Sequence, residues 1–274
     1  MATITIKANY YQQFDADFSR AVPAEGYGGW KKTEIDISRE HTGMAVMHAS
    51  SGGTREKFPG WHRAEEYFPR ANEIARTVFP PLLSAARKVK LPVFHIAGGG
   101  DFYKKHPGYL HAVHLAGTKP EPGPEIIEPD PVLRKLYDFR AENVYPGKHN
   151  KDDIIRGAKT ADFLEEAKPV DDEGIAVNGK QLFALCKEAG INHLIYAGFA
   201  INWCLLLSPG GMVDMGGRGV MCSAFRQAVT AVENKETARS ELGKENGLWR
   251  VATAFGFVFD VDDFIDAMDN ISSI

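Results

Sequence analysis

Residues 193–207, HLIYAGFAINWCLLL, join an apolar run, a turn and a cysteine in one order. The run HLIYA predicts a buried strand, because it is short and apolar and Gly198 follows it at once. A six-residue turn then leads to Cys204, and the three leucines after the cysteine predict the start of a helix. A strand that passes into a helix through a short turn is the repeating unit of a parallel α/β sheet.

Apolar runs of the same kind occur on both sides of this unit, with helical patterns between them. Ile74, Val78 and Leu82 recur every four residues, which favours a helix packed on a sheet. Pro80 and Pro81 predict that this helix kinks or restarts. We therefore expect a doubly wound α/β domain with about six parallel strands, the other five at 44–47, 92–97, 174–177, 220–225 and 256–259.

Residues 98–160 differ from the rest of the chain in composition. They begin with three consecutive glycines and hold seven of the fifteen prolines, so they are not expected inside the sheet. The segment is too long for a plain connection, which favours a lid over a pocket, an interface arm or a small insertion. A short helix is expected within it at 132–142.

Composition excludes several classes of protein. The 274 residues are 44% hydrophobic, which is ordinary for a globular chain and against disorder. A formal net charge of -4 gives no basic surface for nucleic acid or for anionic membranes. Three cysteines and no apparent signal peptide favour a reducing compartment, so we expect a cytoplasmic protein with no membrane or nucleic-acid partner.

Cys204 is the sharpest candidate for chemistry, because a cysteine that opens a helix is favoured as a thiolate nucleophile. The alternative is a small buried hydrophobic residue with no reaction to perform. Cys186 and Cys222 fall inside a predicted helix and a predicted strand, so they are expected to be inert. His95 is expected to be a hydrogen-bonded core residue, and a solvated loop is expected for His106, His111 and His114 rather than a metal site.

The sequence around Cys204 resembles the isochorismatase-like cysteine hydrolases. The matching stretches there are GINHLIYAGFAINWCLLLSPGGMVDMGGRG at 190–219 and AVTAVENKET at 228–237. Upstream, TGMAVMHAS at 42–50 resembles the family's first strand, and FPPLLSAARKVKLPVFHIAG at 79–98 resembles its first helix and second strand. The resemblance implies a three-layer α/β/α fold with a six-stranded, mostly parallel sheet. It implies a single domain over 1–274, with a Pro/Gly-rich insertion at about 98–160.

The resemblance also implies a reaction and a site. In this family a cysteine thiolate attacks a small amide-like carbonyl, and water then hydrolyses the resulting thioester. Carried over, Cys204 is the nucleophile, the main-chain amides of Ala200 and Cys204 form the oxyanion hole, and the Phe199–Ala200 peptide bond is cis. No cofactor and no metal are expected. The pocket is expected to include Asn178, Ile201, Asn202 and Trp203.

Two catalytic positions of the family are changed in this chain. His48 stands where the family's first strand ends in Asp, and we expect it to act as the base toward Cys204. The region of the family's lysine falls at Val177 or Asn178, where no lysine stands.

Three hypotheses about function follow. The first is a cysteine hydrolase that cleaves a small amide-like C–N bond through Cys204. The second is a catalytically impaired member that binds a small molecule or serves as an oligomeric scaffold. The third is hydrolysis of a vinyl ether without a nucleophilic cysteine, as in isochorismatase itself. The resemblance implies a homo-oligomer in each case.

Overall fold

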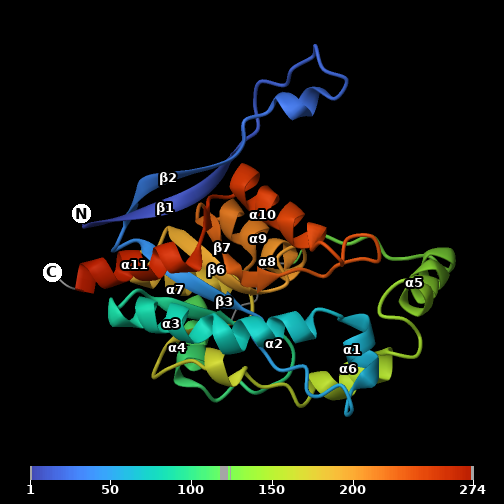
Figure 1. The fold of residues 1–274 in the computed structure, drawn as a ribbon. Coiled ribbons are helices and arrows are strands. Elements are labelled where there is room, and N and C mark those ends of the chain that lie inside the picture. The colour runs from blue at the N-terminus through green and yellow to red at the C-terminus, as the bar shows by residue number, and fades with distance from the viewer. Residues whose placement is uncertain (1, 118–122, 124, 273–274) are drawn as a thin grey trace.

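An eight-stranded sheet runs through the computed structural model, which describes residues 2–117, 123 and 125–272 (Figure 1). The strand order is β2-β1-β8-β7-β6-β3-β4-β5, and the six strands from β8 to β5 are parallel. All six expected strands are present, so the predicted α/β class is confirmed. Their bounds are β3 Thr42–Met47, β4 Val93–Ile96, β5 Gly174–Ala176, β6 His193–Phe199, β7 Met221–Thr230 and β8 Val258–Phe259.

The expected strand number was too low by two, because an antiparallel hairpin extends the sheet beyond β8. Its strands are β1 Thr3–Gln12 and β2 Gly29–Ser38, and their tip projects from the body of the molecule (Figure 1). Ile4, Ile6 and Ala8 alternate with exposed residues along β1 and are buried. This period of two is the pattern of a strand with one face on the core.

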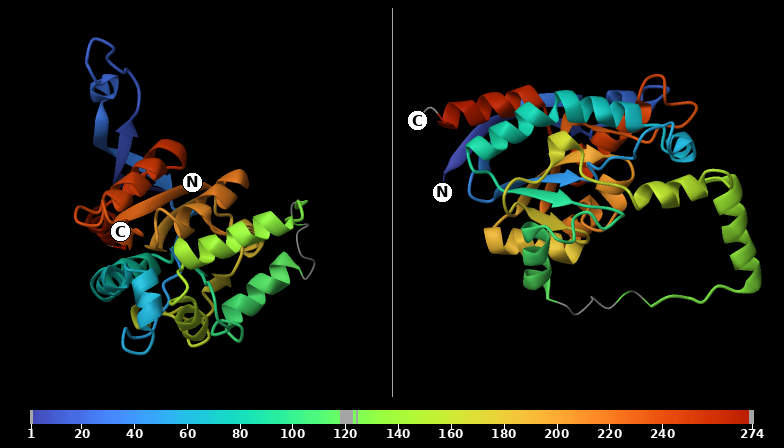
Figure 2. Two further views of the ribbon diagram at one scale, coloured as in Figure 1. Left: turned by 90° about the vertical axis from the view of Figure 1, so that its right-hand side faces the viewer. Right: turned by 90° about the horizontal axis from the view of Figure 1, so that it is seen from below.

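Helices cover both faces of the sheet, as a three-layer fold requires (Figure 2). Successive residues of β3 show the two faces, because Met44 and Val46 join one apolar cluster and Ala45 and Met47 join the other. The first face carries α2 Phe68–Thr77, α3 Phe79–Lys88 and α11 Val261–Ser272. The second carries α4 Pro107–Ala116, α7 Gly179–Ala189, α8 Cys204–Leu207, α9 Met212–Gly217 and α10 Leu242–Ala254.

Local signals set several helix ends. Pro80 and Pro81 stand in the first turn of α3, directly after α2 ends, so the predicted restart of the helix is confirmed. Gly190 ends α7 in the left-handed conformation, with φ 71°, which glycine adopts at little steric cost.

The segment from 98 to 160 contains helices and, in its described part, no strand. Its helices are α4, α5 Pro131–Asn143 and α6 Lys151–Ala158, and α5 confirms the helix expected near 132–142. Figure 2 shows α5 standing away from the layers, and none of its residues is buried. His111 and His114 lie in α4 and His106 caps it, so the expected loop is a helix.

One short helix and two 3-10 turns remain among the described residues. Helix α1, Pro59–Ala64, packs on α6 at the edge of the layers. Short 3-10 turns occupy Pro23–Gly26 in the hairpin tip and Glu165–Ala167 before β5. Within the described residues, no helix is both long enough and apolar enough to cross a lipid bilayer.

Candidate functional site

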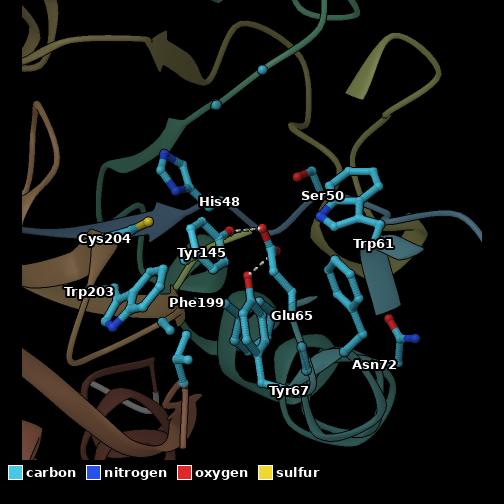
Figure 3. Close-up of a pocket in the computed structure, with 16 residues that line it drawn as sticks. His48, Ser50, Trp61, Glu65, Tyr67, Asn72, Tyr145, Phe199, Trp203 and Cys204 are labelled. Atoms are coloured by element: carbon cyan, nitrogen blue, oxygen red, sulfur yellow. Dashed lines mark hydrogen bonds between the residues drawn. The ribbon is translucent and has the colours of Figure 1, made fainter. Parts of the chain in front are cut away.

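A pocket opens where the connections of the sheet change direction. Strands β3, β4 and β5 follow one another to one side, while β6, β7 and β8 follow one another to the other side. In such sheets, ligands bind beyond the carboxyl ends of the strands at this switch point, here between β3 and β6. A cavity of about 290 Å³ lies there, and Cys204, His48 and Glu65 are among its lining residues (Figure 3).

His48 directly follows β3 and turns the chain out of the strand. Its φ is 52°, in the left-handed region, and its main-chain N–H donates to the Ile96 carbonyl at 2.8 Å. Gly98 leaves room for the imidazole, because a Cβ at that position would lie 2.7 Å from His48 Nε2. Burial lowers the pKa of His48 to about 4. The imidazole is therefore neutral near pH 7 and is able to accept a proton.

The turn after β6 places Cys204 in the same pocket, on the side of His48 (Figure 3). The peptide bond between Phe199 and Ala200 is cis, which is the bond that the resemblance singled out. The amides of Trp203 and Leu205 both donate to the Ala200 carbonyl, at 3.1 Å each. In the described part of the chain, the amides of Ala200 and Cys204 donate to no protein group, so both are available to an oxyanion. Cys204 is partly exposed and begins α8, which has four residues and is a single turn.

A carboxylate that the sequence did not single out faces the same cavity. Glu65 follows α1, and its two oxygens accept hydrogen bonds from Tyr67 at 3.2 Å and Tyr145 at 3.0 Å. Figure 3 shows both bonds converging on Glu65. Burial, and then the charge of Glu65, raises the pKa of both tyrosines, which keeps their hydroxyls protonated as donors.

The insertion holds the wall that carries Glu65. The Gly60 amide at the start of α1 donates to Asp153 of α6 at 2.6 Å. Trp61 of α1 packs over Gly157 of α6, where a Cβ would lie only 2.2 Å from the indole ring. Tyr145, which reaches the pocket just after α5, also meets Trp203 edge-on with ring centroids 5.2 Å apart. The insertion therefore lines the pocket with a side chain of its own and fixes a second wall.

The structure brings some of the expected site residues together and leaves others apart. Cys204, His48, Phe199, Ala200 and Trp203 all line the cavity. Within the described residues, neither the His48 imidazole nor the Cys204 thiol has a hydrogen-bond partner, so no direct bond joins them.

Three residues expected in the pocket have other roles. Asn178 caps α7 by accepting from the Gln181 amide at 2.9 Å. Ile201 is fully buried in the core. Asn202 binds the main chain of Val232 through both ends of its amide, at 2.8 and 3.0 Å. An Asn before a helix is a common cap, which is the physical reason that Asn178 is unavailable to the pocket.

The other two thiols lie in the core, as predicted. Cys186 and Cys222 are buried, and burial raises the pKa of each to about 12. His95 is buried as expected and its Nε2 lies 2.9 Å from Glu173, but its Nδ1 has no partner among the described residues. No group of three or more His, Cys, Asp or Glu side chains in the described ranges is arranged to hold a metal ion.

Comparisons with known proteins give matches among solved structures. No family model matches the sequence, and no curated protein matches it. The chain is similar to a cysteine hydrolase from Pseudomonas syringae pv. phaseolicola 1448A, with 14% identity, 85% of this chain and 95% of the other covered, and a TM-score of 0.47. It is similar to an isochorismatase family protein from Burkholderia thailandensis, with 12% identity, coverage of 85% and 98%, and a TM-score of 0.44. It is also similar to the YcaC gene product of Escherichia coli, described as an octameric hydrolase of unknown specificity, with 11% identity, coverage of 85% and 82%, and a TM-score of 0.41.

Proposed function

We propose that this pocket hydrolyses a small amide-like C–N bond with Cys204 as the nucleophile. One observation carries the proposal. A partly exposed thiol, a neutral imidazole and two unpaired main-chain amides line one cavity at the switch point of a parallel sheet. Nucleophile, base and oxyanion donors are the three parts that acyl transfer requires.

In the proposed reaction, His48 takes the proton of the Cys204 thiol as the sulfur attacks the carbonyl carbon. The carbonyl oxygen becomes an oxyanion and accepts from the amides of Ala200 and Cys204. Collapse of this intermediate breaks the C–N bond, and His48 returns the proton to the departing amine. Water then attacks the thioester with His48 as base, which releases a carboxylic acid and restores the thiol.

Among the described residues, no hydrogen bond joins His48 to Cys204. Catalytic hydrogen bonds are often long without substrate and tighten when it binds, so their absence does not oppose the proposal. In the part of the chain that the structure describes, no Lys or Arg lines the pocket to stabilise a thiolate. In the proposed reaction, His48 removes the proton while the sulfur attacks. No free thiolate then forms before substrate binds, so no neighbouring cation is needed to stabilise one.

The test is the alkylation rate of each cysteine by iodoacetamide across pH, followed by peptide mass spectrometry. Cys186 and Cys222 are internal controls in the same molecule, because both are buried. We expect Cys204 to react faster than both and His48→Gln to slow it. In an ammonia-release assay on a panel of small amides, His48→Gln should lower kcat by about 10²-fold or more, and Cys204→Ala should abolish turnover.

Other outcomes favour the other two hypotheses. If Cys204 reacts no faster than the buried thiols and no amide is turned over, the chain is a ligand-binding or scaffold protein. If Cys204→Ala retains activity toward a vinyl ether, the reaction is of the isochorismatase type.

A homo-oligomer and a cytoplasmic location belong to the same proposal. Exposed apolar side chains on the hairpin tip and on α5 support self-association, including Phe18 at 86% and Phe139 at 61% exposure. Light scattering of the purified protein would test the oligomer, and a monomer at micromolar concentration would contradict it.

A further inference from the structure

The charge of the pocket is set by one side chain. Among the described residues that line it, Glu65 is the only carboxylate, and none is a Lys or Arg. His48 is neutral near pH 7, because burial lowers its pKa to about 4. The nearest arginines in sequence point elsewhere, since Arg63 donates to Asn150 and Arg70 forms a bidentate pair with Glu66. The pocket therefore carries one uncompensated negative charge.

Glu65 retains the capacity to bind a ligand. A carboxylate offers about four acceptor sites, and the hydroxyls of Tyr67 and Tyr145 occupy two of them. These bonds hold the carboxylate in place without neutralising it, because a phenol donates a hydrogen bond but no charge. A cationic group at the remaining acceptor sites would supply the counter-charge that the two phenols do not, through a charge-assisted hydrogen bond.

Aromatic rings surround this charge and suit the same kind of ligand. Trp61, Tyr67, Tyr145 and Trp203 line the cavity (Figure 3), and Phe68 lines it as well. An ammonium group is attracted to the face of an aromatic ring, and the attraction grows when water is excluded. A cavity of about 290 Å³ limits the ligand to a small molecule.

We propose that Glu65 and the surrounding rings select a substrate with an ammonium or methylated ammonium group, whose amide carbonyl then lies at Cys204. The substrate class is therefore a small cationic amide. Its amide part rests on the proposed hydrolase function, whereas the selection of a cation does not.

The first test measures charge selection without requiring hydrolysis. Cys204 is modified with the trimethylammonium-ethyl and the sulfonato-ethyl methanethiosulfonates, and each rate is divided by the rate of the same reagent with free 2-mercaptoethanol. Mass spectrometry assigns the modified peptide. The wild-type ratio of cationic to anionic rate should be on the order of tenfold or more, because the charge of Glu65 acts at close range with little screening.

Glu65→Gln keeps the shape and one acceptor but removes the charge, so it should bring this ratio close to one. Glu73→Gln is the matched control, because it removes the same charge from an exposed site on α2 outside the cavity. It should leave the ratio unchanged. A wild-type ratio near one, or a high ratio that survives in Glu65→Gln, would overturn the proposal.

The second test compares two isosteric amides in the ammonia-release assay. 4-Aminobutanamide carries an ammonium group where pentanamide carries a methyl group. We expect kcat/KM to favour the cationic amide by about tenfold in the wild type and by little in Glu65→Gln. If the reagent test shows charge selection but neither amide is hydrolysed, cation recognition stands and the hydrolase proposal fails. If the wild type hydrolyses pentanamide with the same kcat/KM as 4-aminobutanamide, the hydrolase proposal stands and the cationic substrate class fails.

Discussion

Replacing Gly157 by Ala should loosen the pocket wall that the insertion supports. Gly157 lies inside α6, and a Cβ there would stand 2.2 and 2.5 Å from two atoms of the Trp61 ring. Carbon atoms in contact are ordinarily about 3.5 Å apart, so the ring would have to move by more than about 1 Å. Phe68 packs edge-on against the same ring, with centroids 5.4 Å apart, and limits where it can go.

Two effects of opposite sign decide how Gly157→Ala changes the free energy of unfolding. Ala is a better helix former than Gly by about 1 kcal/mol, which favours the variant. Forcing an extra methyl group into a packed site costs about 1–3 kcal/mol. We expect the second effect to win, giving a net loss of about 1 kcal/mol, with the ring of Trp61 displaced toward the cavity.

Gly216→Ala in α9 is the matched control, because a Cβ there meets its nearest neighbour, Phe255, at an ordinary 3.8 Å. It should raise the free energy of unfolding by about 0.5–1 kcal/mol. Urea denaturation measures both variants, and iodoacetamide modification of Cys204 reports access to the pocket. Gly157→Ala should be less stable than wild type and show a changed Cys204 rate. The reasoning would be refuted if the two variants gained equal stability and Cys204 reacted as in wild type.

Three further predictions concern stability. His193 and His48 have pKa values of about 4 in the folded protein because of burial, against about 6.5 when unfolded, so the unfolded state binds more protons between these values. The free energy of unfolding should therefore fall as pH drops from 6.5 to 4. The loss should be about 3 kcal/mol for His193 and less for the partly exposed His48. A free energy of unfolding that does not change with pH in urea titrations would contradict this. Gly198→Ala should lower the free energy of unfolding by about 4 kcal/mol or more and lower the Tm sharply. The φ of Gly198 is 122°, and a Cβ there would lie 1.9 Å from the Met47 carbonyl oxygen. An unchanged Tm would be inconsistent with that contact. Asn202→Ala should lower the free energy of unfolding by about 1–3 kcal/mol in urea denaturation, because the main-chain N–H and C=O of Val232 lose their partners. A loss below about 0.5 kcal/mol would contradict this and show that water replaces the amide.

Five of the six parallel strands could be predicted because each is a short apolar run buried on both faces, and the sixth, β7, because most of its residues are buried. Such a strand can be recognised from its own residues without knowing which strands lie beside it, as 193–197 shows. The hairpin was missed although Ile4, Ile6 and Ala8 alternate with polar residues, because an alternating strand is hard to recognise without its partner, and β2 begins 17 residues after β1 ends.

The part of the site at the strand ends was also accessible from sequence. His48 and Cys204 follow β3 and β6, and the switch-point rule places such residues together. Glu65 and Tyr145 follow helices instead: α1, which packs on α6, carries Glu65 to the cavity, and Tyr145 follows α5 and donates to Glu65. The dense run of aromatic and acidic residues at 61–68, WHRAEEYF, was the one local signal that could have drawn attention to Glu65.

The hairpin also decides how the sheet ends. Without it, the boundary on that side would be β8, a two-residue strand that is buried in the core. With it, the boundary is β2, whose solvent-exposed residues include Lys31, Glu34 and Asp36. A strand from another molecule that paired along β2 would have to strip water from these charges. The charged residues of β2 therefore disfavour aggregation by edge-to-edge strand pairing at this side of the sheet. A fragment that began after β2 would lack these charges and would be more prone to such pairing.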